Sequence, residues 1–487
     1  MVIYELILFF LISYMPLHQK AFWAMSFFLV GVLGASIFIS WPRGFFICLG
    51  LWLLTVCSLL MFRKYGLAVL SIAVLIGITY YGWQHAQFVS ERPQLSQTGN
   101  FNALILTSRT EGETQALMAR LDTGMRIQFT TKRYPEYSYG DRVTLSGVLQ
   151  PVAAENGYYA KERISGTMRF PVILLVAHDQ GIPIFRALFA IRKSVITSFQ
   201  KALPPEQATF LSGLTLGRSV GFSKEFSQKL KDTGTTHLVA LSGYNVSIIA
   251  IGITALFSFW FSRRRAFIIS VLAIIGFVLM TGAESSVVRA AIMAIIVLIA
   301  ERAGRLYLMR NAIVAAAFVM TLLNPEVLTF DIGFQLSFLA LLGIVYLKPA
   351  LAFWLNIPNA PGFLQWRKNL WTTIAAQLAV LPVLLLHFGF FAPIALVTNI
   401  LILVFIPATM MLGFCVFLAS LFSSVLALIV ALPARLLLAY ELGVINFFSN
   451  FPMRFSVATF SLAIVLIYYG ILILFIAWMQ YRKQRIV

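Results

Sequence analysis

Segment 233–252, TGTTHLVALSGYNVSIIAIG, contains polar residues whose types and spacing could form a catalytic or binding site. The segment starts polar and continues as an apolar helix with polar and small residues in its first turns. Ser242 and Asn245 are three residues apart, and His237 and Leu241 are four apart, so the polar groups fall roughly on one helical face. Because an unpaired polar group in lipid costs several kcal/mol, this face should contact protein or water.

Two interpretations of this face follow from the residues alone. Small residues could serve helix–helix packing. Alternatively, Ser242 could act as a nucleophile with His237 as its base. Five residues apart on one helix is poor geometry for that pair, and the chain has no GxSxG elbow. The hydrolase interpretation is therefore the weaker one, and we expect no catalytic residue.

Charged residues inside apolar segments are further candidates, because a charge deep in a span costs on the order of 2.5–3.5 kcal/mol. Five acidic residues follow position 232: Glu284, Glu301, Glu326, Asp331 and Glu441. In 281–293, Glu284 stands at a helix start, and Arg289 lies inside the helix one turn after Ser285. In 322–344, Asp331 and Gln335 are four residues apart on one face.

We predict that these groups meet and that Arg289 pairs with Asp331 or Glu284. The alternative is an ion-pair network that only fixes helix packing, and it is compatible with a water-filled passage lined by the same groups. The full candidate polar cluster is Thr236, His237, Ser242, Gly243, Asn245, Glu284, Ser285, Arg289, Asp331, Gln335, Ser337 and Asn399.

Composition identifies an integral membrane protein. Of 487 residues, 60% are hydrophobic, and the mean hydropathy is +0.87. No soluble domain could bury that much apolar surface. The net charge is +19 although only 11% of residues are charged. For a membrane protein, the positive-inside bias of cytoplasmic loops is the first explanation of such a basic excess, ahead of nucleic-acid binding.

Four regions can be distinguished along the chain. Residues 1–83 hold four apolar runs, at 2–17, 21–40, 44–62 and 66–83. Residues 84–180 hold short alternating strands at 101–108, 113–122, 124–131 and 141–150, with glycines at the turns, which predict a small β-barrel resembling an OB-fold. This region has ten basic and nine acidic residues, so a structural or gating role is as well supported as a DNA-binding one.

The rest of the chain, residues 181–487, is predicted to consist mostly of helices in or on the membrane. Residues 181–232 have helical periodicity with excess basic residues, which predicts amphipathic interfacial helices that contact lipid head groups or guide a polyanion. Residues 233–487 form the main membrane domain, with an interfacial helix expected at 433–450 and spans near 236–261, 266–283, 286–302, 306–323, 330–347, 369–388, 389–407, 411–431 and 457–479. The fold class is therefore a polytopic α-helical membrane protein with one small extracytoplasmic β-barrel (OB-like) domain.

The orientation follows from the basic clusters, which fall on alternate turns. Arg63–Lys64, Arg263–Arg265, Arg302–Arg310, Lys348 with Arg367–Lys368, and Arg482–Arg485 lie on one side in that assignment. The positive-inside rule makes this side cytoplasmic. We therefore expect a multi-pass protein of the cytoplasmic membrane, with region 84–180 outside the cell and the C-terminus in the cytoplasm.

No metal site or cofactor is expected. The five histidines are scattered singly, and no HxHxDH run is present. The cysteines (Cys48, Cys57 and Cys415) lie in apolar runs without a CxxC pair, which is typical of inert packing residues. The chain has no P-loop, so a partner or an ion gradient would supply energy.

Several ordered motifs resemble those of the ComEC-type competence family, membrane proteins that pass single-stranded DNA into bacterial cells. The stretch FSQKLKDTGTTHLVALSGYNVSII resembles the family signature, in which Leu-His usually stands where this chain has Tyr244-Asn245. Further matches are LSGLTLGRS (211–219), GAESSVVRA (282–290), the stretch from Asn-Pro to DIGFQLS (324–337), and 377–407 with Asn399 and Pro407 as fixed points. Longer family members carry a C-terminal metallo-β-lactamase-like domain, and we expect this chain to be a short form without it.

The resemblance implies a channel or translocase for single-stranded DNA in uptake for transformation. Its partners would be single-stranded DNA, membrane lipid, a DNA-receptor protein, a separate nuclease and a cytoplasmic ATPase. The alternative is a transporter of another anionic polymer or lipid, with the Ser/His hydrolase as the last possibility.

Overall fold

The computed structural model describes residues 16–38, 44–61, 65–93, 96–111, 113–152, 157–217, 222–355, 366–451, 455–456 and 461–486. Most of the apolar run predicted at 2–17 lies outside them. The chain divides into two compact units. Unit 1 comprises Met1–Arg186 and Ile292–Asp331, and unit 2 comprises Ala187–Ala291 and Ile332–Val487. A segment from the second half of the sequence, 292–331, therefore packs with the N-terminal part.

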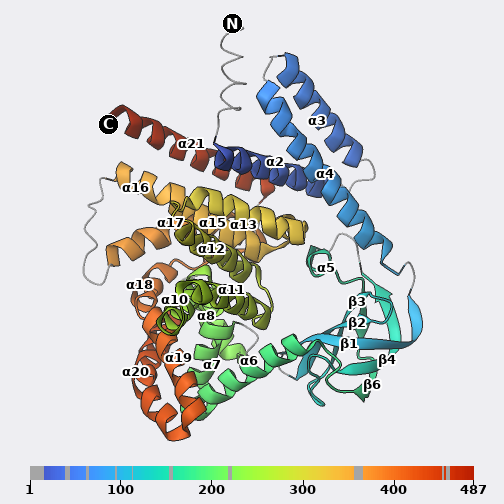
Figure 1. The fold of residues 1–487 in the computed structure, drawn as a ribbon, viewed down its shortest axis with the longest axis vertical. Helices are drawn as coiled ribbons and strands as arrows, with labels where there is room; N and C mark the ends of the chain where they lie inside the picture. Colours follow the sequence, from blue (N-terminus) through green and yellow to red (C-terminus); the bar gives the residue numbers. More distant parts are fainter. Residues whose placement is uncertain are drawn as a thin grey trace. The chain divides into compact units, whose positions relative to one another are not determined.

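The described part of unit 1 begins with three apolar helices, α2 (Leu17–Phe38), α3 (Gly44–Met61) and α4 (Tyr65–Ser90). Helices α2 and α4 lie side by side (Figure 1). Their backbones approach closely at two glycines. A Cβ on Gly31 would stand 2.2 Å from Val74 O, and one on Gly77 would stand 2.3 Å from Phe28 O. Small residues permit this kind of packing in lipid, where dispersion contacts between backbones replace the hydrophobic effect.

The predicted β-barrel is confirmed. Its strands are β1 (Gln97–Glu111), β2 (Thr114–Leu121), β3 (Arg126–Lys132), β4 (Arg142–Pro151), β5 (Gly166–Arg169) and β6 (Val172–Ala177). The order β1-β2-β3-β5-β4 closes through pairing of β4 with β1, and β6 adds to β4 outside the ring. Strand β1 serves both neighbours because its register shifts between Ile105 and Thr107, where a bulge bends it. Alternate side chains such as Ile105, Leu117 and Phe129 fill the interior.

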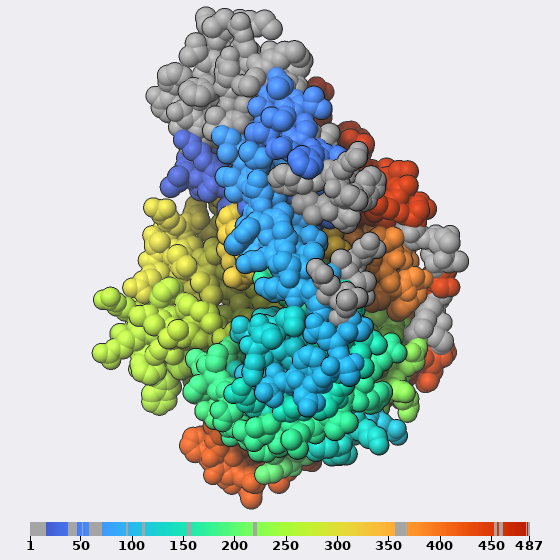
Figure 2. Space-filling view, turned by 90° about the vertical axis from the view of Figure 1, so that its right-hand side faces the viewer, coloured from blue at the N-terminus to red at the C-terminus, as the bar shows by residue number. Residues whose placement is uncertain are grey.

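One end of the barrel domain contacts the membrane helices of unit 1. The short helix α5 (Gly157–Glu162) follows β4 and meets α14 (Val327–Phe330). A Cβ on Gly157 would stand 2.4 Å from the Phe330 ring, so only glycine permits this approach. Helix α13 (Met309–Leu323) packs on α2, with the rings of Phe318 and Phe28 5.0 Å apart. Figure 2 shows α4, in light blue, running onto the barrel domain in cyan and green.

Unit 2 is built from helices. Those before the 292–331 segment are α6 (Pro183–Ala202, whose first turn belongs to unit 1), α7 (Pro205–Leu216), α8 (Lys224–Asp232), α9 (Thr236–Val239), α10 (Gly243–Trp260), α11 (Arg263–Met280) and α12 (Ser285–Arg302, whose C-terminal part belongs to unit 1). Those after it are α15 (Ile332–Leu342), a π-helical turn (Gly343–Leu347), α16 (Lys348–Trp354), α17 (Trp366–Phe388), α18 (Ala395–Leu403), α19 (Ile406–Phe422), α20 (Ser424–Ser449) and α21 (Leu462–Ile486). Two short strands, β7 (Phe390–Phe391) and β8 (Phe455–Ser456), pair with each other.

The described part of the 181–232 region forms three helices, as the periodicity predicts. Helix α7, however, is not amphipathic with one side facing solvent. Seven of its twelve residues are buried, including Phe210, Leu211 and Leu214. Together with residues of α8, α18, α19 and α20 they form the largest apolar cluster of unit 2. Helix α7 is therefore a core helix, since apolar neighbours cover it on several sides.

In the described part of the chain, six helices are long and apolar enough to cross a membrane, and a bent pair would make a seventh. The six spans are Leu17–Ile37, Thr236–Trp260, Ile332–Trp354, Asn369–Phe388, Ser424–Ser449 and Leu462–Lys483, of which Thr236–Trp260 comprises α9 and α10. The pair is α18 with α19, bent by 49°. The predicted division into a span at 411–431 and an interfacial helix at 433–450 is wrong, because the chain turns at Ser423 and α20 runs unbroken to Ser449.

Proline inside α17 is accommodated by a neighbouring helix. Pro382 has no N–H and leaves the carbonyl of Leu378 without its helical donor. The Tyr468 hydroxyl of α21 donates to Leu378 O at 2.9 Å, and the next tyrosine donates to Ala379 O at 2.9 Å. A carbonyl freed in an apolar layer is thereby satisfied by a side chain from another helix.

Candidate functional site

The apolar segment that begins at Thr236 is broken at residues 240–242. Helix α9 ends at Val239, Ala240 and Ser242 have extended backbone, and α10 starts at Gly243. Ser242 caps α10, because its Oγ accepts from Asn245 N at 3.3 Å and donates to Asn245 Oδ1 at 3.0 Å. The continuous helix predicted for 236–261 is therefore two helices with a polar joint.

Side chains satisfy the carbonyls that the break sets free. Asn245 is 1% exposed, and its Nδ2 donates to Leu238 O and Leu214 O, both at 3.1 Å. The Ser286 hydroxyl of α12 donates to Leu241 O. Irregular backbone at membrane depth requires such partners. Asn245 thus ties α7, α9 and α10 together, a role for which two amide protons and one acceptor are suited.

Arg289 of α12 lies against the first turn of α10. Its side chain is buried, with 9% exposure, and a Cβ on Gly243 would stand 2.5 Å from its Nη2. Its Nη1 donates to Ser337 O of α15, and its Cζ lies 5.6 Å from the centre of the Phe338 ring. Three of the predicted segments, around Ser242, Arg289 and Ser337, therefore meet within unit 2.

Within unit 2, the predicted ion pair of Arg289 with Glu284 is not formed. Among the described residues of unit 2, no carboxylate, Glu284 included, lies within 4 Å of its guanidinium. Asp331 belongs to unit 1, where its Oδ2 lies 3.0 Å from Lys161 Nζ. A basic residue of the barrel domain, far away in sequence, is thus an ion-pair partner of Asp331 within unit 1.

The remaining predicted residues lie around these helix ends. Thr236 and His237 open α9, and the exposed His237 has Nδ1 3.0 Å from Gly234 O. Glu284 and Ser285 stand at the start of α12, while Gln335 and Ser337 are half-buried on α15. Asn399 is buried in α18 with 3% exposure. Its neighbour Thr398 donates to Thr233 O at 3.0 Å, so the 377–407 motif contacts the start of segment 233–252.

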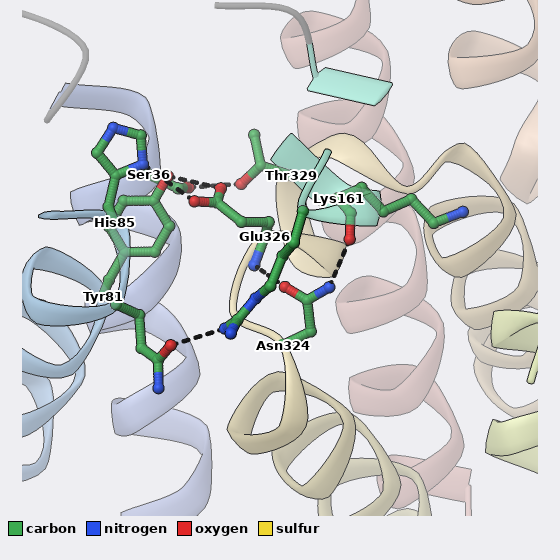
Figure 3. A network of polar contacts seen from close by, with 9 residues as sticks. Ser36, Tyr81, His85, Lys161, Asn324, Glu326 and Thr329 are labelled. Carbon is green, nitrogen blue, oxygen red and sulfur yellow. Dashed lines mark hydrogen bonds and ion pairs between the residues drawn. The ribbon is translucent and has the colours of Figure 1, made fainter. Parts of the chain in front are cut away.

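A second polar network lies in unit 1 around Glu326, which is 3% exposed (Figure 3). The Tyr81 hydroxyl donates to its Oε2 at 2.8 Å, and His85 Nδ1 lies 3.0 Å from its Oε1. Asn324 Oδ1 accepts from the Glu326 backbone at 3.2 Å, and Asn324 Nδ2 donates to Lys161 O at 2.8 Å. This network joins α4 and α5 to the turn between α13 and α14.

Lys161 completes the junction between the barrel domain and this turn. Its ammonium contacts Asp331 and, at 3.4 Å, Glu162 Oε1. Burial disfavours the charged form of Lys161, but the two carboxylates outweigh it, and the net result is a raised pKa. Lys161 is therefore held as a cation on the side of the barrel domain that faces the turn.

Sequence reasoning missed the Glu326 network. Glu326 was counted among the acidic residues, and His85 among the scattered histidines, but neither was assigned a role. Tyr81 and Lys161 carried no motif. The available signal was the charge itself, because Glu326 follows an apolar helix and needs partners when buried.

In the part of the chain that the structure describes, no group of three or more His, Cys, Asp or Glu residues could hold a metal ion. A separate buried carboxylate, Glu441 of α20, is 0% exposed and accepts from Thr409 Oγ1 at 2.7 Å. It fixes α20 to α19.

These features define a class: a polytopic helical membrane protein with a small β-barrel domain and a broken, polar helix in its membrane part. The competence protein family matches residues 214–482, more than half of the 487 residues, and the chain belongs to this family. The matched region contains the α9–α10 break, Arg289 and the Glu326 turn.

A curated relative, ComE operon protein 3 of Bacillus subtilis (strain 168), is 30% identical over 223 residues. The alignment covers 45% of this chain and 27% of that relative, so the two proteins share only part of their length. No solved structure matches the chain at a significant level.

Proposed function

We propose that this protein acts in competence as a channel or translocase that carries single-stranded DNA across the cytoplasmic membrane. The single observation that carries the proposal is the α9–α10 break. An apolar helix is interrupted inside the region matched by the competence family, and the side chains of Asn245 in α10 and Ser286 in α12 donate to carbonyls at the break. Irregular backbone at membrane depth occurs where it is buried in protein or lines a watery path, and broken helices mark substrate sites in transporters.

The proposal includes an orientation. With the basic clusters in the cytoplasm, the starts of α10 and α12 lie toward the outer face, on the same side as the barrel domain. The C-terminus is then cytoplasmic. The strand would be delivered by a DNA-receptor protein and a separate nuclease, with a cytoplasmic ATPase as the source of force, and membrane lipid would surround the helices. Neither a cofactor nor a metal belongs to the proposal.

The geometry favours this over the Ser/His hydrolase. The Ser242 hydroxyl donates to Asn245 Oδ1, and His237 Nδ1 faces Gly234 O. The two groups are engaged separately as a helix cap and a turn contact, which does not favour His237 as the base of Ser242. A transporter of another anionic polymer or lipid remains the second candidate because the buried, uncompensated Arg289 would suit any such cargo.

A transformation assay tests the proposal. A strain lacking the gene should internalise no labelled DNA, and a plasmid copy should restore uptake. Ser242→Ala should reduce uptake only partly, because losing a cap costs about 0.5–2 kcal/mol. Full uptake in the deletion strain would refute the proposal, and complete loss with a folded Ser242→Ala protein would favour the hydrolase.

A further inference from the structure

We infer that Arg289 and the first turn of α10 form a binding site for one phosphodiester group. The inference rests on the proposed function, and the group that binds at the site is a backbone phosphate of the single-stranded DNA. It is carried by two independent features, the free edge of a buried guanidinium and the amides of a helix start.

The free edge of the guanidinium is the side formed by Nε and Nη2. Nη1 is already used on Ser337 O. Arg289 Nε has no hydrogen-bond partner in the described part of the chain, although the side chain is 9% exposed. Nη2 is the atom that faces Gly243. Side-by-side N–H groups of this kind match two oxygens of a phosphate group.

The charge of Arg289 is uncompensated. No carboxylate among the described residues of unit 2 lies within 4 Å of it, and its other contact is the Phe338 ring. A buried charge without a partner is strongly unfavourable, and an anion that binds there recovers part of that cost. Arg289 is therefore suited to bind a ligand of opposite charge, which no described carboxylate of unit 2 replaces.

The helix start adds two donors. Ser242 takes the N–H of Asn245, and within the described residues no acceptor is found for the N–H groups of Gly243 and Tyr244. The start of a helix carries partial positive charge, so a cation beside it is unfavourable unless an anion lies between them. The Tyr244 side chain is 49% exposed, so the turn is not sealed on that side.

Gly243 makes the arrangement possible. Any side chain at this position would occupy the place of Nη2, since a Cβ would stand 2.5 Å from it. The glycine therefore does more than permit a turn, because it lets the guanidinium reach the helix start. A single arginine with two amides should bind a phosphate only weakly. Weak binding suits a conducting path, because its contacts must release the strand.

The test measures binding to the full-length protein in nanodiscs of phosphatidylcholine. The probes are a fluorescent oligothymidylate and the same oligomer with uncharged methylphosphonate linkages. Arg289→Gln should weaken binding of the charged oligomer about tenfold and lower the slope of log K against log salt by about 0.7, the value for one phosphate on a single strand. Binding of the uncharged oligomer should not change.

The matched control is Arg435→Gln, which removes one charge from unit 2. Arg435 donates to Ala202 O through Nε and Nη2 and is not part of the site. It should leave oligomer binding and its salt slope unchanged. Gly243→Ala is the second variant, and it provides the test if Arg289→Gln fails to fold. It keeps the charge of Arg289 while displacing Nη2, so it should also weaken binding severalfold. Unchanged binding by folded Arg289→Gln or Gly243→Ala would overturn the inference.

A lipid head group carries the same phosphodiester chemistry, and native mass spectrometry of retained phosphatidylglycerol separates the two sources. Loss of bound lipid in Arg289→Gln with unchanged oligomer binding would overturn the assignment to the strand. The transformation assay separates this site from the proposed function. If the deletion strain takes up no DNA and Arg289→Gln restores full uptake, the function stands and the site fails. If the deletion strain takes up DNA normally, the function fails, and oligomer binding still decides the site.

Discussion

Lys161 of α5 and Asp331 at the end of α14 form an ion pair, with 3.0 Å between Nζ and Oδ2. The Asp331 side chain is 5% exposed and that of Lys161 30%. The pair joins the barrel domain to the turn after α13, next to the Glu326 network. Unit 1 is therefore held together by charges as well as by apolar packing.

Breaking this pair should destabilise unit 1. Lys161→Met removes the ammonium group that contacts the buried Asp331 carboxylate, and we expect a loss of about 1–3 kcal/mol in the free energy of unfolding. Asp331→Asn should restore part of that loss in the double variant, because it removes the buried charge that Lys161 contacts. Thermal unfolding in detergent measures both. Lys229→Met, which removes an exposed pair with Glu225, is the control and should change stability by less than about 0.5 kcal/mol.

The pair should also have a defined pH dependence. The pKa of Lys161 is raised in the folded protein, despite burial, by Asp331 and Glu162. Its contribution is therefore fully present below the unfolded pKa of about 10.4 and is lost as pH rises through the higher folded value. The difference in melting temperature between wild type and Lys161→Met should be constant from neutral pH to about 10 and shrink above it. A difference that vanishes already near pH 8 would contradict this origin.

The Glu326 carboxylate should be essential to the junction of α4 with the α13–α14 turn. Glu326→Gln weakens the acceptor of Tyr81 and His85, and we expect a loss of about 1–3 kcal/mol. Tyr81→Phe should cost less, about 1 kcal/mol, because it leaves the His85 contact. Both are read from thermal unfolding. The exposed Glu301→Gln is the matched control, and an equal effect there would show that the loss is not local.

Asn245 should prove structural. Asn245→Ala leaves the carbonyls of Leu214 and Leu238 without donors and removes the acceptor of Ser242, so a loss of about 2–4 kcal/mol is expected. Ser247→Ala, on an exposed face of the same helix, should be nearly neutral. Expression level and melting temperature report the difference. A stable Asn245→Ala protein would show that the break needs no side-chain support.

The orientation can be tested by labelling. Cysteine placed at the exposed Ser138 of the barrel domain, with the three native cysteines replaced, should react with an impermeant reagent in intact cells. Cysteine at Arg264 should react only after lysis, since its basic cluster is expected in the cytoplasm. Labelling in the opposite order would reverse the topology.

Much of the fold was readable from the sequence because it follows from short-range periodicity. Apolar runs of span length predict helices, and alternation between 101 and 150 predicts four strands of the barrel, β1 to β4, but not β5, which completes the ring between β3 and β4. The motifs in 211–407 predict the family, which the match over 214–482 confirms. The division at Ser423 was not predicted, because an apolar run has no periodic signal that separates one long helix from two short ones.

The partners of the charged residues were decided by the tertiary structure alone. The sequence identifies Arg289 and Asp331 as costly in lipid, yet it cannot say that Asp331 is paired with Lys161 while Arg289 meets Ser337 and Gly243. In the same way, the sequence does not reveal that Asn245 donates to the carbonyl of Leu214 in α7. Nor does it reveal that Tyr468 of α21 donates to the carbonyl that Pro382 leaves without a helical donor. Burial and hydrogen bonding depend on which distant segments come together, so they are properties of the packed chain and not of any local window.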